Sequence, residues 1–186
     1  GAAVIRRVHA EDFCQALGIS PALKYESDGG PGLRQCMKIL EGSHNASQDR
    51  DTFFKTQLVF WLLAAIDSHA KNFSLFLEPG SAYRMTPLYD VISAYPLMDH
   101  DSLAPARAKI LPRHSLSTAK AMGFSPTRAA AIMEETVAQT EAVIESVNAR
   151  LPNGFPAKVA DPILSGLRAQ AQKLGSDPNY FIPFNG

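Results

Sequence analysis

The sequence has little cysteine and no surplus of charge of either sign. Its 186 residues include two cysteines, Cys14 and Cys36, and its 18 basic side chains balance its 18 acidic ones. A framework of several disulfides is excluded, and we expect both cysteines to be buried thiols of a cytoplasmic protein. The balanced charge gives no indication of a nucleic-acid or membrane partner, although it allows a local basic patch.

The sequence also has no long hydrophobic run. The apolar stretch over residues 58–66 is about half the length that crosses a bilayer, and no segment resembles a targeting peptide. We therefore expect no membrane association. The 46% apolar and 19% charged residues are typical of a globular domain, and one domain is the simplest expectation at this length.

Local patterns predict a mainly α fold with one small β-hairpin. Helical spacing and capping signals mark residues 11–18, 33–42, 49–66, 125–152 and 156–175. Two β-like runs, 73–77 and 82–88, flank turn residues at 78–81. We expect loops over residues 19–32, 43–49 and 98–109, and residues 4–8 have the pattern of a short strand.

Four details refine these helices. Asp49 or Asp51 can cap the helix over 49–66, and Ser125 with Pro126 can begin the next one. Pro162 can break the last helix. The second half of the 49–66 helix is apolar all round, so we expect it to be buried on every side as the central helix.

Polar residues follow this apolar helix abruptly. Asp67, His69, Lys71 and Asn72 leave its end, where a rigid helix can hold a loop facing a cleft. The predicted hairpin then returns the chain at Asp90, which should lie near Asn72. We therefore expect the two carboxylates and the amide to converge.

Such a set of oxygen atoms suits Mg²⁺, which completes its shell with phosphate and water. Protein kinases use this arrangement: an Asp faces the substrate hydroxyl, an Asn five residues later holds Mg²⁺, and a further Asp holds Mg²⁺ against the phosphates. Asp67, Asn72 and Asp90 match these positions, and Lys71 could add a positive charge beside the transferred group. The usual sequence motifs of protein kinases, His-Arg-Asp and Asp-Phe-Gly, are absent.

Simpler interpretations remain open for each residue. Asp67 could end the helix, with Asn72 and Asp90 as turn residues; His69 could be a buried, hydrogen-bonded histidine; and Lys71 could be solvated. Asp67 and His69 could also be half of a metal-hydrolase site. That alternative lacks convincing further ligands, because the other histidines are scattered at His9, His44, His100 and His114.

Several long segments resemble a known family. IDSHAKNFSLFLE, YRMTPLYDVISAYPL, EDFCQALGI, KYESDGGPG and ILPRH are similar to the HipA toxins of bacterial toxin–antitoxin pairs. The resemblance implies the C-terminal helical lobe of a divergent serine/threonine protein kinase that uses ATP and Mg²⁺. It also implies a helix-turn-helix antitoxin, operator DNA bound through the antitoxin complex, and a protein substrate such as an aminoacyl-tRNA synthetase.

The resemblance implies roles for individual residues. Asp67 corresponds to the catalytic base; His69, Lys71 and Asn72 to the loop that meets ATP and metal; and Tyr89 with Asp90 to the second nucleotide and metal segment. Where the family has Gly-Asn before this loop, the chain has Ala64 and Ala65, which a buried helix end can accept.

Two departures limit the comparison. No Gly-rich phosphate loop precedes the helix, because GGPG at 29–32 sits between predicted helices, so we expect the nucleotide lobe to be absent and the isolated chain to be inactive. Residues 98–110 are shorter than the corresponding family segment.

A non-enzymatic antitoxin- or DNA-binding module is the alternative function. A basic segment could contact DNA phosphates in such a complex, although a solvated loop and helix start explains each residue alone. Its residues are Lys109, Arg113, His114 and Lys120.

Overall fold

The computed structural model describes residues 8–98 and 119–176, and the chain divides into two compact units. The first unit contains the residues up to Arg50 together with 69–90, and the second contains 51–68 and the residues from Val91 onward. Within the described ranges, no helix is both long enough and apolar enough to cross a membrane.

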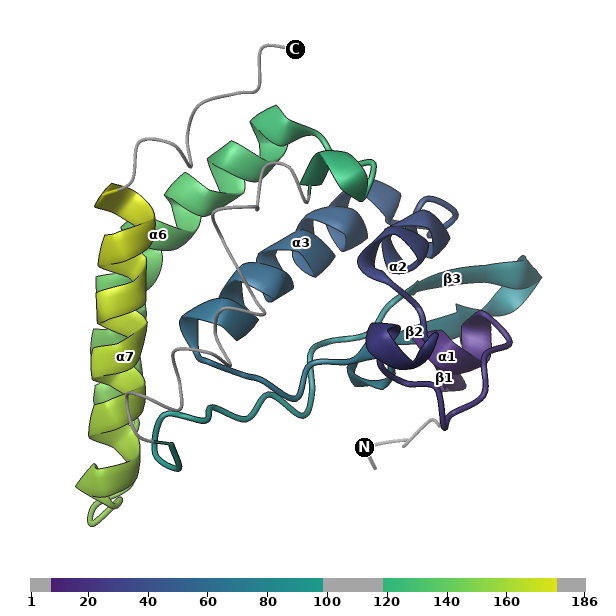
Figure 1. Ribbon diagram of the computed structural model, residues 1–186. Helices are drawn as coiled ribbons and strands as arrows, with labels where there is room; N and C mark the ends of the chain where they lie inside the picture. Colours follow the sequence, from purple (N-terminus) through teal and green to yellow (C-terminus); the bar gives the residue numbers. More distant parts are fainter. Residues whose placement is uncertain (1–7, 99–118, 177–186) are drawn as a thin grey trace, which may run out of the picture. The chain divides into compact units, whose positions relative to one another are not determined.

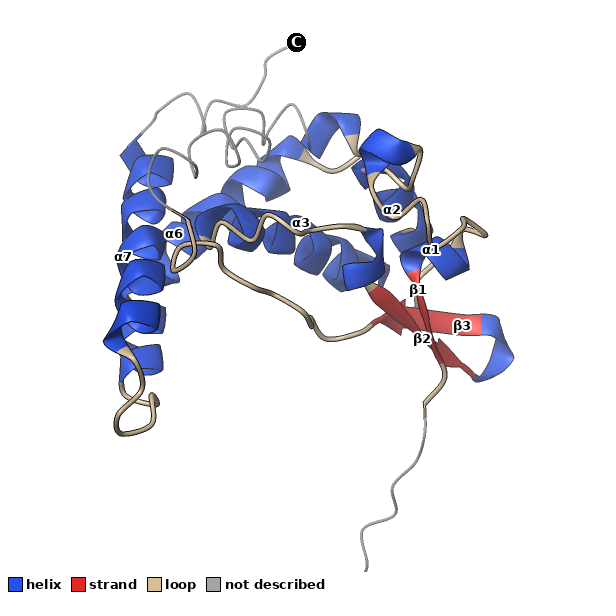
Figure 2. Cartoon of the chain, turned by 60° about the horizontal axis from the view of Figure 1, so that its bottom comes forward, coloured by secondary structure: helices blue, strands red, loops and turns tan. Residues whose placement is uncertain are grey.

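The first unit contains a three-stranded antiparallel sheet in the order β1-β2-β3 (Figure 2). Its strands are β1 (Ala10–Asp12), β2 (Ser74–Glu78) and β3 (Ala82–Met85). The predicted hairpin is confirmed as β2 and β3, with Gly80 at a φ of 76° in the turn. Strand β1 was missed, and the predicted strand over residues 4–8 lies almost wholly outside the described residues.

Helix α1 (Phe13–Ala16) begins directly after β1. Asp12 accepts a hydrogen bond from the Gln15 N–H, and the Gln15 side chain accepts one from the Asp12 N–H, both at 2.9 Å. This capping box fixes the start of the helix at Phe13. The prediction of a helix over 11–18 was therefore wrong at its start, because Glu11 and Asp12 pair with β2 instead.

The GGPG stretch has a packing role. It follows η1 (Glu26–Asp28) and precedes α2 (Leu33–Leu40). A Cβ atom on Gly30 would collide with the carbonyl oxygens of Leu23 and Tyr25, so the backbone passes too closely for any other residue. This steric reason for a glycine agrees with the rejection of GGPG as a phosphate loop.

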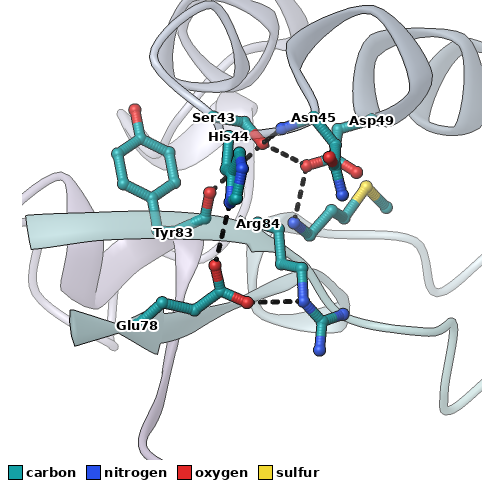
Figure 3. A network of polar contacts seen from close by, with 8 residues as sticks. Ser43, His44, Asn45, Asp49, Glu78, Tyr83 and Arg84 are labelled. Atoms are coloured by element: carbon teal, nitrogen blue, oxygen red, sulfur yellow. Dashed lines mark hydrogen bonds and ion pairs between the residues drawn. The ribbon is translucent and has the colours of Figure 1, made fainter. Parts of the chain in front are cut away.

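A buried carboxylate joins the start of α3 (Ala46–Leu62) to strand β3 (Figure 3). Asp49 accepts hydrogen bonds from the Ser43 hydroxyl and from the Met85 N–H, the latter at 2.8 Å. The Tyr83 carbonyl accepts from the His44 N–H at 2.8 Å. The loop before α3 thus satisfies the outer edge of β3, which would otherwise be open to pairing with another strand.

The predicted start of α3 at Asp49 was wrong, because the Asp49 side chain bonds to Met85 and does not cap the helix. The helix begins at Ala46, so residues 46–49 are not a loop. Asp49 lies in the first turn, where an acid suits the helix dipole, but its side chain turns toward Met85. Asp51 is also not a cap, because its carboxylate pairs with Arg128 at 2.8 Å.

We expect Asp49→Ala to lower the free energy of unfolding by about 2–3 kcal/mol, because it leaves the buried Met85 N–H without an acceptor. Urea denaturation measures this change. Gln48→Ala, at an exposed position on the same turn, is the control and should change stability by less than about 0.5 kcal/mol. Equal effects of the two substitutions would contradict the role of the Asp49 network.

The second unit contains the body of α3 and two further long helices. The rings of Phe54 and Phe124 stack with centroids 5.0 Å apart. Helices α6 (Pro126–Asn148) and α7 (Ala157–Ser176) lie side by side (Figure 1). Ser125 caps α6 as predicted, and Pro126 occupies the first turn. Pro162 lies inside α7 without ending it, so the predicted break is absent.

Helix α3 ends at Leu62, earlier than the predicted end at residue 66. Ala64 adopts a left-handed backbone with a φ of 48°, and its N–H donates to the Trp61 carbonyl at 3.2 Å. The Ala65 N–H donates to the Phe60 carbonyl at 2.8 Å. This pair of bonds is a Schellman motif, in which glycine usually takes the left-handed position. Most of the apolar half is buried as expected, but Val59 and Leu63 are only partly buried and Ile66 is 42% exposed, so the burial does not extend to every side.

Candidate functional site

The site in the first unit is built around the buried amide of Asn72. It lies at the end of η2 (Ala70–Asn72), directly before the hairpin, and is 2% exposed. Its Oδ1 accepts from the His69 N–H at 2.9 Å, and its Nδ2 donates to Asp90 Oδ2 at 3.1 Å. The predicted proximity of Asn72 and Asp90 is confirmed.

Asp90 is held in a conformation that few residues adopt. Its φ is 56°, in the left-handed region, which aspartate tolerates better than most side chains. The carboxylate is exposed while one of its oxygens accepts from Asn72. Backbone strain of this kind concentrates at functional sites, where it fixes the direction of a side chain.

The hydroxyl of Tyr89 ties this segment to the loop before the hairpin. It donates to the Lys71 carbonyl at 2.6 Å, and the Ser74 hydroxyl lies 2.6 Å from it. Because the phenol proton is used on Lys71, Ser74 must donate to Tyr89. Burial raises the pKa of Tyr89 above its usual value, and the charges of Asp12 and Asp90 add to this effect. The phenol therefore stays protonated at neutral pH.

Lys71 turns toward an acid at the start of the sheet. Its Nζ lies 3.9 Å from Asp12 Oδ2, and both side chains are partly exposed.

The two cysteines are buried thiols. Cys14 is fully buried, and burial raises the pKa of its thiol. Burial raises the pKa of Cys36 to about 12. The thiols are unpaired and buried, as predicted, and neither is a nucleophile at neutral pH.

His69 packs against the loop that precedes α2. Its ring meets that of Tyr25 edge-on, with centroids 5.2 Å apart, and the ammonium of Lys24 lies 4.9 Å from the Tyr25 centroid. The Ala70 N–H also donates to the Lys24 carbonyl at 3.4 Å. These contacts tie the loop carrying Lys71 and Asn72 to residues 24–25.

Asp67 belongs to the second unit, whereas His69, Asn72 and Asp90 belong to the first. It is exposed and lies in the stretch after α3 that has neither helix nor strand. Its predicted convergence with Asn72 and Asp90 stays a prediction. Of the basic segment, Lys120 lies in a short helical turn, and the other three residues are outside the described ranges.

The donor atoms of the site suit a hard cation. Asn72 Oδ1 and the Asp90 carboxylate each retain lone pairs beyond the bonds they accept. Oxygen donors including one exposed carboxylate match Mg²⁺, which needs only one or two protein carboxylates beside phosphate and water. Among the described residues, no group of three His, Cys, Asp or Glu side chains forms a metal cage, which gives no support to a metal-hydrolase site.

A comparison with family models identifies the family of the chain. The model of the HipA-like C-terminal domain matches residues 2–144, which is more than half of the sequence. The chain belongs to the HipA-like C-terminal domain family. The resemblance inferred from IDSHAKNFSLFLE, YRMTPLYDVISAYPL and the other quoted segments is therefore confirmed.

Three related proteins carry kinase names. A candidate kinase of Sinorhizobium fredii, Y4mE, is 38% identical over 96 residues, covering 50% of this chain and 23% of the relative. A second candidate kinase of that organism, Y4dM, is 29% identical over 163 residues, covering 84% of this chain and 38% of the relative. The serine/threonine-protein kinase toxin HipA of Shewanella oneidensis is 37% identical over 102 residues, covering 48% and 23%. The matches thus span about a quarter to two fifths of these relatives.

A solved structure confirms the fold. HipA from a Shewanella oneidensis complex with HipB and operator DNA superposes with a TM-score of 0.75 and 21% identity. The alignment covers 93% of this chain and 45% of that one. At this identity the likeness establishes the fold: a mainly helical HipA-like lobe with a small antiparallel sheet.

Two site residues escaped the sequence analysis. Asp12 was placed inside a helix, although the Asp-x-x-Gln pattern from Asp12 to Gln15 is a recognisable capping signal. Ser74 had no signal, because its bond to Tyr89 depends on how the hairpin and the following loop meet.

We expect the Asn72–Asp90 bond to show coupling in a double-mutant cycle. Asn72→Ala, Asp90→Ala and the double variant should give a coupling energy of about 1–2 kcal/mol in urea denaturation. Either single substitution already removes the charge-assisted bond, so the double variant does not lose it a second time. Asp90→Asn keeps an acceptor and a residue that tolerates positive φ, so it should be milder. Additive effects of the two alanine substitutions would contradict the contact.

Proposed function

We propose that this chain is the C-terminal lobe of an ATP-dependent serine/threonine protein kinase toxin of a toxin–antitoxin system. The observation that carries the proposal is the hydrogen bond between Asn72 and Asp90, with Asp90 in a left-handed backbone. An amide and a carboxylate held at the mouth of a hairpin are the metal-binding elements of the kinase template. Family membership and the kinase name of the Shewanella relative support it.

The proposal gives each loop residue a role. Asp67 orients the substrate hydroxyl and accepts its proton as phosphoryl transfer proceeds. Lys71 and His69 lie on the loop that meets the nucleotide, and the ammonium of Lys71 is held near this loop by Asp12. Tyr89 fixes Asp90 through its bond to the Lys71 carbonyl.

Asn72 Oδ1 and the free oxygen of Asp90 would hold Mg²⁺. The ion supplies a positive charge that neutralises the phosphate oxygens of ATP when it is bound. The chain's own contribution is to hold these two oxygen donors still. The His69 N–H fixes the Asn72 amide, and that amide in turn fixes the Asp90 carboxylate.

The partners in the proposal follow the relatives. The Shewanella structure contains HipB and operator DNA, and by analogy we propose a helix-turn-helix antitoxin for this protein, with DNA bound through the antitoxin complex. The phosphorylated substrate would be a cytoplasmic protein, of which an aminoacyl-tRNA synthetase is one example.

Phosphate transfer by the complete reading frame tests the proposal. We expect Mg²⁺-dependent transfer from labelled ATP to the protein itself and to lysate proteins. Asp67→Asn should lower the rate by about 10²–10⁴-fold, the range for loss of a general base. Asp90→Ala should lower it strongly and raise the Mg²⁺ concentration required.

Glu134→Gln neutralises an exposed carboxylate on α6 and is the control, with an unchanged rate. The 186-residue chain alone should show no turnover, since the nucleotide lobe of the kinase template is not recognisable in it. Absence of transfer by a folded, complete wild type would contradict the proposal and favour a non-catalytic antitoxin- or DNA-binding module.

A further inference from the structure

Residues 93–95, which we call the α3 clamp, donate three hydrogen bonds to the chain at the end of α3. The bonds run from the Tyr95 hydroxyl to the Leu62 carbonyl (3.1 Å), from the Ser93 hydroxyl to the Leu63 carbonyl (2.6 Å) and from the Ala94 N–H to the Ala64 carbonyl (3.1 Å). The last carbonyl groups of a helix have no partner within the helix. The clamp supplies those partners from a segment far away in the sequence.

The clamp completes a local motif. The carbonyl groups of Phe60 and Trp61 accept from the Schellman turn, and the clamp takes those of residues 62–64. Five consecutive carbonyl groups therefore have donors. Because these bonds fix the backbone up to Ala64, they set the direction in which the chain leaves toward Asp67.

Tyr95 also lies against α7. A Cβ atom built on Gly166 would come 2.5 Å from Tyr95 Cζ and 2.6 Å from Cε2, closer than atoms pack in proteins. Only glycine at position 166 admits the ring in this place. Ala64 and Ala94 are buried in one small cluster with Tyr95, so the ring is packed from the α3 side as well.

We propose that Ser93 and Tyr95 are positioning residues that hold Asp67 in place through the end of α3, and that Gly166 of α7 sets Tyr95 for this role. The catalytic part of this inference rests on the proposed function. Its structural part does not. Helix α7 lies beyond residues 2–144, which the family model matches, so that match assigns Gly166 no role.

The expected effect is on turnover and not on nucleotide affinity. A misplacement of about 1 Å in a catalytic group can lower a rate by about 10²-fold. Loss of one clamp bond leaves α3 folded, and Asn72 and Asp90 belong to the other unit. Binding of ATP is thus preserved while the base is less well placed.

The test compares Tyr95→Phe, Ser93→Ala and Gly166→Ala in the complete protein. Hydrogen exchange is followed at the Ala64 and Ala65 amides, which the turn protects. We expect exchange to be about tenfold faster in each variant. We also expect kcat to fall about tenfold or more, with the KM for ATP within about twofold of wild type.

Two controls separate this role from general destabilisation. Gly175 lies on the same helix, and Gly175→Ala gains the same helix propensity, but its Cβ would meet only the side chain of Val137, at 3.2 Å from Cγ1 and 4.0 Å from Cγ2. Thr136→Val removes a buried hydroxyl bond to the Ile132 carbonyl inside α6. Both should leave exchange at Ala65 and the kcat unchanged.

The outcomes are distinguishable. Unchanged exchange at Ala64 and Ala65 in Tyr95→Phe would overturn the clamp, whatever the activity. Faster exchange with an unchanged kcat would overturn the positioning role. Absence of phosphate transfer in wild type would overturn the proposed function, and the exchange rates would still decide whether the clamp exists.

Discussion

The end of a buried helix must find donors for its last carbonyl groups, and this constraint shapes the second unit. At α3 the requirement is met by the Schellman turn at Ala64 and by residues 93–95. The chain is therefore fixed three residues before Asp67. In the proposed kinase, the same hydrogen bonds that complete the helix also steady the segment that carries the proposed base.

In the first unit, one buried side chain holds two segments of the chain together. Asn72 is buried and uses both ends of its amide, accepting from the His69 backbone and donating to Asp90. A buried amide with both ends bonded has one favourable orientation, which gives Asp90 a fixed partner despite its exposed position. The chain from Ser74 through Tyr89 to the Lys71 carbonyl braces the same loop from the other side.

Features with local signals could be predicted from the sequence. The hairpin around Pro79 and Gly80, the Ser125 cap and the approach of Asp90 to Asn72 depend on turn chemistry and short loops, which neighbouring residues encode. Strand β1 could not be predicted, because three residues become a strand only when β2 lies beside them.

The errors at both ends of α3 have a common cause. Asp49 resembles a cap in sequence, but a distant backbone N–H at Met85 draws its carboxylate away. Ala64 resembles a helix residue, but donors from residues 93–95 favour a left-handed turn there. In each case a long-range hydrogen bond overrides local propensity, and the pattern of a single segment does not contain its partner.

The central claim is that Asn72 and Asp90 together hold a divalent ion. Paramagnetic broadening by Mn²⁺, measured by NMR on the complete protein with a non-hydrolysable ATP analogue, tests it most directly. The account predicts that the Asn72 side-chain amide and the backbone amides around Asp90 broaden first, and that Asp90→Ala removes the effect. Broadening confined to other residues, with these signals unchanged, would contradict it.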